Sequence, residues 1–308
     1  MNATKKYYNS LSDYYIGLFG EKVYKLALTA STTCPNRDGK IGNNGCIFCS
    51  TEGSGDFASN GALSVQKQIL EAKQLIKNKK TNKYIAYFQS YTNTYGDLSQ
   101  LNTIFNAAVF HPEISGLSIA TRPDCLEAEV LELLSSLNFK KKLWVELGLQ
   151  TMHQTTADFI RRGYTLDVFE AAVNDLTNLN IDVVVHLIIG LPGESRKMLL
   201  ETIEYLSNLP VSGVKLQLLH VLKNTDLEKY YSLHPEFLLS LEEYCELVVD
   251  CVERLSPSIV IHRLTGDGPK NLLVAPLWST NKKIVLNTIN KKFSERNTYQ
   301  GKLWNVCP

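Results

Sequence analysis

Hydrophobic and polar positions along the chain follow two alternating periodicities. Short apolar runs rich in β-branched residues are typical of buried strands, and apolar residues recurring every three or four positions are typical of helices. The strand-like runs cover residues 23–30, 84–88, 116–121, 143–148, 181–190 and 213–221. Helical segments separate them, so the pattern predicts a parallel sheet covered by crossover helices.

Individual helices are marked by apolar stripes and by their first residues. Val65, Ile69, Ala72 and Ile76 recur at helical spacing after Ser64, which is a suitable N-cap. Further stripes lie at 101–108, 126–137 and 241–255, and a last strand is predicted at 258–264. Six βα units favour a partial barrel over an open doubly wound sheet, although periodicity alone does not decide between them. We expect residues 1–235 to form the barrel core and residues 236–308 a C-terminal α/β extension with a basic tail, packed as one globular unit.

Polar segments follow each of the six predicted strands. They are residues 34–50, 89–95, 121–125, 146–151, 186–193 and 218–225, and they contain Cys, Gln, Tyr, Asn, Arg, Asp, Glu and His. In barrels of this kind the chemistry lies at the carboxyl ends of the strands. We therefore predict one large polar active site at that end.

Charge is distributed unevenly along the 308 residues. The whole chain has a formal net charge of +1, but residues 262–308 carry +6 and residues 1–261 carry −5. A basic tail suggests an anionic partner such as nucleic acid, and a solvated surface without a partner is the alternative. The seven cysteines are an odd number, and neither an apolar leader nor an 18-residue apolar run is present. We expect a protein of the reducing cytoplasm that is not bound to a membrane.

Three cysteines occupy a glycine-rich loop after the first strand. Cys34 stands alone, and Cys46 and Cys49 form a C-x-x-C pair. Structural zinc needs four ligands, so it would have to recruit a distant residue such as Cys125 or His186. A 4Fe–4S cluster held by three thiolates would instead leave one iron open to an external ligand. The residues alone leave both interpretations open.

Longer motifs in the sequence carry a resemblance to a known family. TRPDCL (121–126), ELGLQT (146–151), RRGYT (161–165), HLIIGLPG (186–193) and KLQLLHVLKNTDL (215–227) resemble, in this order, the radical S-adenosylmethionine (SAM) enzymes, in the branch that contains the Elongator catalytic subunit. CPNRDGKIGNNGCIFC, QSYTNTYG and the tail HRLTGDGPKNLLVAPLWSTNKKIVLNTI are similar to the YhcC/YtqA-type radical SAM proteins. The resemblance implies the partial (β/α)6 TIM-like barrel of the radical SAM type.

The same resemblance implies the cofactors and their ligands. Cys34, Cys46 and Cys49 would each bind one iron of a 4Fe–4S cluster, and the fourth iron would chelate the amino and carboxylate groups of SAM. One electron, supplied by an external donor of the flavodoxin or ferredoxin type, would then produce a 5′-deoxyadenosyl radical. We interpret Arg37 and Asp38 as residues that order the loop.

Contacts with SAM are also expected from the resemblance. Arg162 suits a carboxylate because its planar fork donates two hydrogen bonds, and a cation at a helix end is the alternative. His186 is expected at the ribose, or else as an ordinary core residue. A catalytic residue is not assigned. The expected cofactor-binding residues are Phe48 (adenine), Gln89, Tyr91 or Asn93 (the amino group), Gln150, Arg162 and His186.

The resemblance also implies a substrate. It points to tRNA, and specifically to conversion of the 5-carboxymethylaminomethyl side chain of the wobble uridine to aminomethyl. A tail with Lys270, Lys282, Lys283, Lys291, Lys292 and Arg296 would hold the phosphates. The alternatives are radical chemistry on a small molecule and a non-enzymatic, zinc-stabilised nucleic-acid-binding protein.

Overall fold

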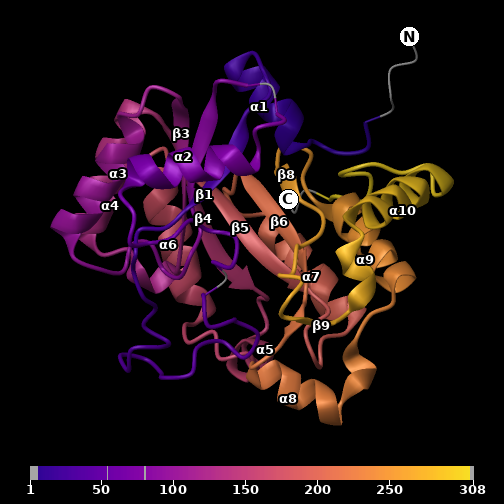
Figure 1. Cartoon of the computed structure of the whole chain (residues 1–308). Coiled ribbons are helices and arrows are strands. Elements are labelled where there is room, and N and C mark those ends of the chain that lie inside the picture. The colour runs from indigo at the N-terminus through magenta and orange to yellow at the C-terminus, as the bar shows by residue number, and fades with distance from the viewer. Residues whose placement is uncertain (1–5, 54, 80, 306–308) are drawn as a thin grey trace. The chain divides into compact units, whose positions relative to one another are not determined.

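A computed structural model describes residues 6–53, 55–79 and 81–305 of the chain (Figure 1). Its main sheet has seven strands in the order β1-β2-β3-β4-β5-β6-β8, and β7 and β9 form a separate antiparallel pair. The strands are β1 (Tyr24–Leu28), β2 (Tyr84–Phe88), β3 (Ile114–Thr121), β4 (Lys142–Gln150), β5 (Asp182–Ile189), β6 (Gly213–Leu218), β7 (Val221–Leu222), β8 (Val260–Arg263) and β9 (Leu273–Ala275).

Helices connect successive strands of the main sheet, as the apolar stripes predict. They are α1 (Leu11–Phe19), α2 (Val65–Leu75), α3 (Leu98–Val109), α4 (Ala128–Lys140), α5 (Gln154–Phe159), α6 (Leu166–Asn178), α7 (Arg196–Ser207), α8 (Asp226–Leu233), α9 (Leu241–Arg254) and α10 (Lys282–Glu295), with 3-10 turns η1 (Pro123–Cys125), η2 (Pro235–Phe237) and η3 (Leu277–Thr280). Within the described ranges, no helix combines the length and the apolar composition needed to cross a membrane.

The parallel sheet with crossover helices confirms the predicted partial barrel. Strands β1 to β4 pair in parallel in chain order, with Ala27 opposite Tyr87 and Tyr87 opposite Ser118. The strand predicted at 258–264 joins the same sheet as β8, in parallel beside β6, with Gly213 opposite Val260. The C-terminal extension therefore adds a seventh strand to the six that the βα pattern predicts.

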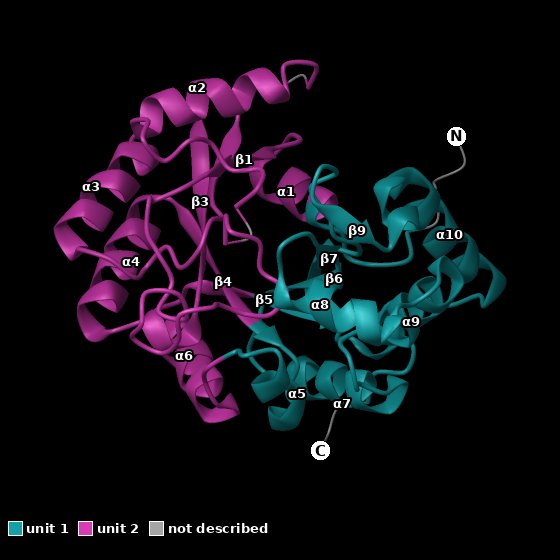
Figure 2. Cartoon of the chain, turned by 60° about the horizontal axis from the view of Figure 1, so that its bottom comes forward, with its two compact units in different colours: residues 1–11, 149–162, 185–308 teal, residues 12–148, 163–184 magenta. Residues whose placement is uncertain are grey.

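The chain forms two compact units that interleave along the sequence (Figure 2). Unit 2 comprises residues 12–148 and 163–184, and unit 1 comprises residues 1–11, 149–162 and 185–308. The cysteine loop and the strands β1 to β3 belong to unit 2, and α7 to α10 belong to unit 1. The boundary expected at residue 235 stays a prediction.

In unit 1, cations of the basic tail are paired with carboxylates of α9. Lys292 contacts Glu242 at 2.7 Å and Glu246 at 2.6 Å. Arg296 contacts Glu246 at 3.2 Å, and Asp250 and Glu253 at 2.8 Å each. The hydrogen bonds with Glu242 and Glu246 raise the pKa of Lys292 above its usual range. We call these residues the α9–α10 ion-pair cluster. Two further tail lysines also have carboxylate partners, Asp267 for Lys282 and Glu295 for Lys291.

Candidate functional site

The three loop cysteines lie on an irregular segment that follows β1 in unit 2. Each is half-buried. Two tight turns fix the backbone beside them, because the amide of Arg37 donates to the carbonyl of Cys34 at 2.8 Å and the amide of Cys49 donates to that of Cys46 at 3.1 Å. The second turn therefore sets the relative positions of the C-x-x-C pair.

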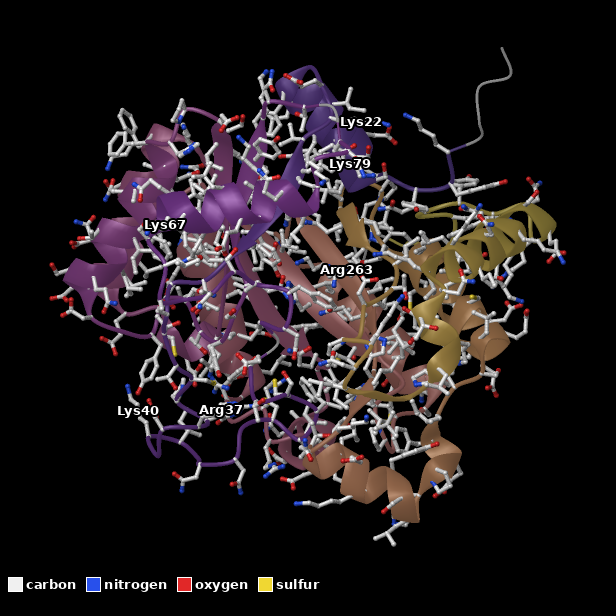
Figure 3. All side chains as sticks on the ribbon, in the orientation of Figure 1. Lys22, Arg37, Lys40, Lys67, Lys79 and Arg263 are labelled. Carbon is white, nitrogen blue, oxygen red and sulfur yellow. The ribbon has the colours of Figure 1, made fainter. Side chains whose placement is uncertain are left out.

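Arg37 orders the loop, as interpreted from the sequence. Its Nη2 donates to the carbonyl oxygens of Cys49 at 3.2 Å and Ser50 at 2.6 Å. The side chain passes close to Gly45, where an added Cβ would lie 2.8 Å from Nε of Arg37 and where φ is +70°. Only a glycine fits this passage without strain. Figure 3 labels Arg37 and Lys40 on this loop, and Lys40 lies 5.1 Å from the ring centroid of Tyr95.

Cys46 lies among groups that act on its thiol in opposite directions. Its pKa is well above the usual range because of a hydrogen bond with Cys49, because of burial and because of the neighbouring thiols, while the guanidinium of Arg122 acts to lower it. In addition, Nδ2 of Asn36 donates a hydrogen bond to Sγ of Cys46 over 3.7 Å. Metal ions bind cysteine as thiolate, so loading this site would release protons.

Arg122, in the TRPDC motif, is held on several sides. Its Nε and Nη2 donate to the two carboxylate oxygens of Asp124 at 2.9 Å and 2.8 Å. Its guanidinium carbon lies 4.9 Å from the ring centroid of Tyr164. The sequence interpretation gave Arg122 and Asn36 no role. Arg122 could have been singled out because TRPDC stands at the end of a predicted strand. Asn36 follows Cys34 and Pro35 in the loop, and nothing in that local sequence indicates a role for it.

The three candidates after β2 have different surroundings. The side chain of Asn93 is fully buried, and its amide is engaged with backbone: Oδ1 accepts from the amide of Ala30 at 3.2 Å, and Nδ2 donates to the carbonyls of Phe88 at 3.1 Å and Ala120 at 2.9 Å. These bonds tie together the ends of β1, β2 and β3. Tyr91 has a positive φ of +55°, and its hydroxyl donates to the carbonyl of Thr51 at 2.5 Å.

Gln89 and Phe48 are the remaining candidates in unit 2. The backbone amide of Gln89 continues the β1–β2 pairing by donating to the carbonyl of Leu28 at 3.0 Å, and its side chain is half-buried. Phe48 lies between the last two cysteines of the loop in the sequence, and its side chain is half-buried. The three cysteines, Phe48 and the three candidates that follow β2 thus all belong to unit 2. Which of those three contacts SAM stays a prediction.

Gln150 and Arg162 lie together in unit 1. Gln150 has a positive φ of +65°, and its Oε1 is buried without a hydrogen-bond partner among the described residues. A strained backbone and an unsatisfied buried oxygen are features that cluster at ligand sites. Arg162 is 1% exposed, and its Nη1 donates to the carbonyls of Leu149 at 3.1 Å and Thr151 at 2.6 Å. Arg162 therefore holds the turn that presents Gln150.

His186 also lies in unit 1, in β5, where it is half-buried. Its expected contact with the ribose of SAM, like the expected carboxylate contact of Arg162, stays a prediction.

The donor set fits a cluster better than a single ion. No three His, Cys, Asp or Glu side chains of the described residues are grouped as one metal ion would require. A cubane makes a different demand, because each of three thiolates binds a separate iron and the fourth iron stays open. The N–H of Asn36 adds a hydrogen-bond donor to one of the sulfurs. Within unit 1, the Oε1 of Gln150, buried without a partner among the described residues, is an acceptor suited to an organic ligand such as SAM.

Most of the chain matches one superfamily and its associated domain. Residues 38–206 match the Radical SAM superfamily, and residues 211–295 match the Radical_SAM C-terminal domain. Among known proteins, uncharacterized protein YtqA of Bacillus subtilis (strain 168) is 43% identical over 302 residues, which cover 98% of this chain and 94% of YtqA. Protein YhcC of Escherichia coli (strain K12) is 34% identical and covers 86% of this chain and 85% of its own.

Two more distant likenesses bear on fold and on chemistry. The solved structure of archaeal Elp3 from Methanocaldococcus infernus, with an N-terminal deletion, matches with a TM-score of 0.65 at 16% identity, and covers 91% of this chain and 65% of that chain. At this identity the match speaks for the fold alone. The tRNA uridine(34) acetyltransferase of Methanocaldococcus jannaschii is 29% identical over 171 residues, or 54% of this chain and 30% of its own length.

These matches decide between the two interpretations of the cysteine loop. The superfamily match spans more than half of the chain and contains Cys46 and Cys49, and the relatives align over nearly the whole length. The radical SAM domain implies a 4Fe–4S cluster and SAM, as expected from the three cysteines. The chain belongs to the radical SAM superfamily.

Proposed function

We propose that this radical SAM enzyme acts on the wobble uridine of tRNA, and converts its 5-carboxymethylaminomethyl side chain to aminomethyl. The observation that carries the proposal is the likeness to an archaeal enzyme named for its action on uridine 34 of tRNA. That likeness covers 54% of this chain, so it supports a shared nucleoside and not a shared reaction.

The residues of the candidate site have distinct tasks in this proposal. Cys34, Cys46 and Cys49 hold the cluster, and the Oε1 of Gln150 accepts a hydrogen bond from SAM. Arg162 keeps Gln150 in place through its bonds to Leu149 and Thr151. Bound SAM would supply a 5′-deoxyadenosyl radical that takes one hydrogen atom from the substrate. Phe48, His186 and one of the residues after β2 complete the SAM contacts.

Atoms and electrons balance if the carboxymethyl group leaves as an aldehyde. The methylene between the nitrogen and the carboxylate would lose one hydrogen atom to the radical and then one electron, and the nitrogen would lose one proton, which leaves an imine. Water hydrolyses the imine, so the carbon–nitrogen bond breaks and the products are the aminomethyl side chain and glyoxylate. The electron would return to the cluster held by Cys34, Cys46 and Cys49, and SAM would be consumed as methionine and 5′-deoxyadenosine.

The test is mass spectrometry of nucleosides in tRNA from a strain that lacks the gene. We expect 5-carboxymethylaminomethyluridine to accumulate, and we expect the wild-type gene, but not a Cys46→Ala variant, to restore the aminomethyl form. With reconstituted protein, dithionite, SAM and the deletion strain's tRNA, glyoxylate and 5′-deoxyadenosine should form in equal amounts. An unchanged wobble-uridine profile would refute the assignment to tRNA.

A specific observation favours a second candidate, radical chemistry on a small molecule. The tail cations that suggested a phosphate partner are largely paired with carboxylates of the same chain. Stimulation of 5′-deoxyadenosine formation separates the candidates, since tRNA from the deletion strain should stimulate it and a tRNA-free metabolite extract should not.

A further inference from the structure

A polar side chain lies directly against a sulfur of the cysteine loop. Nδ2 of Asn36 is 3.7 Å from Sγ of Cys46, within hydrogen-bond range for sulfur, and Asn36 is 4% exposed. An amide hydrogen donated to a cysteine sulfur withdraws electron density from it. The reduction potentials of iron–sulfur clusters depend on such bonds, together with net charge and solvent exposure.

Two backbone features hold the Asn36 amide in this place. The carbonyl of Asn36 accepts from the amide of Gly45 at 2.7 Å, and the carbonyl of Pro35 accepts from that of Ile41 at 2.8 Å. These bonds close the loop between the first and second cysteines around Asn36. The backbone from which the Asn36 side chain extends is thus held by the loop itself.

Gly163 of the RRGYT motif provides the space on the other side of the amide. An added Cβ at Gly163 would lie 2.8 Å from Oδ1 of Asn36 and 3.3 Å from Nη2 of Arg122, and φ is +84°. A side chain at this position would be strained and would also press against Asn36. The glycine therefore lets the amide keep its Nδ2 directed to sulfur.

The charge of Arg122 is a weaker candidate for the same influence. The guanidinium acts on Cys46, but a two-pronged bond with Asp124 at 2.8–2.9 Å compensates its charge. A compensated pair acts at a distance as a dipole, and its field falls faster than that of a bare charge. The direct N–H to sulfur bond is therefore the more specific contact.

We propose that Asn36 is a positioning residue that raises the reduction potential of the cluster by donating its amide hydrogen to the sulfur of Cys46. The reduced cluster carries one more negative charge than the oxidised cluster, so the hydrogen bond stabilises the reduced form more. Asn36 thereby favours the entry of the single electron that SAM cleavage needs. This inference rests on the cofactor that the superfamily implies and does not depend on the identity of the substrate.

The test is a redox titration of the reconstituted full-length protein, followed by electron paramagnetic resonance without substrate. Asn36→Leu removes the donor while nearly keeping the side-chain volume, and Asn44→Leu, at an exposed position of the same loop, is the matched control. At a fixed potential we expect the ratio of reduced to oxidised cluster in Asn36→Leu to fall about tenfold, or about 59 mV for one electron. The control should titrate like the wild type.

Iron and sulfide are measured first, so that loss of the cluster is distinguished from a change in its potential. Asn36→Ser is the second variant, because its shorter side chain keeps the loop polar but does not reach the sulfur. A wild-type potential in either variant with full iron content overturns the proposal. Loss of iron from both variants overturns it as well, because Asn36 would then hold the cluster and not tune it.

Discussion

The cysteine loop and the α9–α10 ion-pair cluster both contain cations, but these cations meet different partners. In the loop, Arg37 donates to backbone carbonyls and Lys40 lies over the ring of Tyr95. In the ion-pair cluster, Lys292 and Arg296 contact carboxylates at 2.6–3.2 Å. Several cations of the tail are thus paired with carboxylates within unit 1, whereas the loop directs N–H groups toward sulfur and carbonyl oxygen.

This comparison shows what a count of charge by segment leaves out. The window 262–308 carries a net +6, but the carboxylates that meet Lys292 and Arg296 lie upstream, on α9. Glu246, Asp250 and Glu253 fall outside the counted window, although the fold places them against α10 and Arg296. Lys292 and Arg296 of the basic segment thus have carboxylate partners on another helix of the same chain, and an anionic partner for the other tail cations stays a prediction.

The largest contrast is expected from removing one cysteine in each region. Cys46→Ala should abolish both iron binding and 5′-deoxyadenosine formation, because three thiolates are needed to hold three irons. Cys245→Ala, in α9, should leave both intact, since that thiol is fully buried and its sulfur donates to the carbonyl of Val285. Iron analysis and chromatography of the reaction products measure the two effects. Iron retained by Cys46→Ala would contradict the assignment of the loop.

The ion-pair cluster is expected to matter for stability and not for binding of RNA. Arg296→Met leaves Asp250 and Glu253, whose side chains are 2% and 6% exposed, without one of their cationic partners. We expect the free energy of unfolding in urea to fall by about 3 kcal/mol. Lys283→Met, at an exposed position of α10, should change it by less than about 0.5 kcal/mol. Our interpretation of this region would be wrong if Arg296→Met weakened the free energy of tRNA binding by more than it lowers the free energy of unfolding.

In unit 1, the burial of His220 is expected to make the stability of the protein depend on pH. Burial lowers the pKa of this histidine to about 4. Smaller effects come from Asp267, which raises the pKa, and from Arg263, which lowers it. The imidazole ring fits closely between Gly266 and Gly268. In the unfolded chain a histidine takes up a proton near pH 6.5, whereas in the folded protein it does so near pH 4. Stability is therefore complete above pH 6.5 and falls as the pH drops toward 4.

We expect His220 to account for about 2 kcal/mol of the stability lost between pH 7 and pH 5. Urea unfolding of the wild type and of His220→Phe at the two pH values measures this contribution as the difference between their losses. Equal losses in the two proteins would show that the carboxylates alone cause the acid sensitivity.

The smallest effect is expected from a single lysine of the loop. If tRNA approaches the cysteine loop, Lys40→Ala should weaken binding by about two- to threefold and lower the slope of log affinity against log salt by about 1. Lys67→Ala is the matched control, because it removes an exposed cation on α2, which Figure 3 shows well away from Lys40. Filter binding at several salt concentrations measures both. If the two variants weakened binding equally, the idea that tRNA approaches the cysteine loop would be wrong.

Local sequence was sufficient to predict the seven strands of the main sheet and the loop that holds the cysteines, but not the separate pair β7 and β9. Residues 84–88 form a strand with the predicted bounds, because apolar and β-branched runs report burial directly. The bond from Asn36 to Cys46 could not be predicted, since it depends on how the loop folds back on itself. The contact of Arg122 with Tyr164 joins residues 42 positions apart, and neither residue alone indicates the other.

Asn93 has a consequence for how mutational scans of this enzyme should be interpreted. Its amide bridges Ala30, Phe88 and Ala120, which follow or end three adjacent strands. Alanine at this position would remove all three hydrogen bonds at once. The ends of β1, β2 and β3, beside which the cysteine loop begins, would then no longer be joined by one side chain. Such a variant would lose activity as completely as one that lacks a cofactor contact. A melting temperature below that of the wild type, measured alongside activity, would show that Asn93 has a structural role.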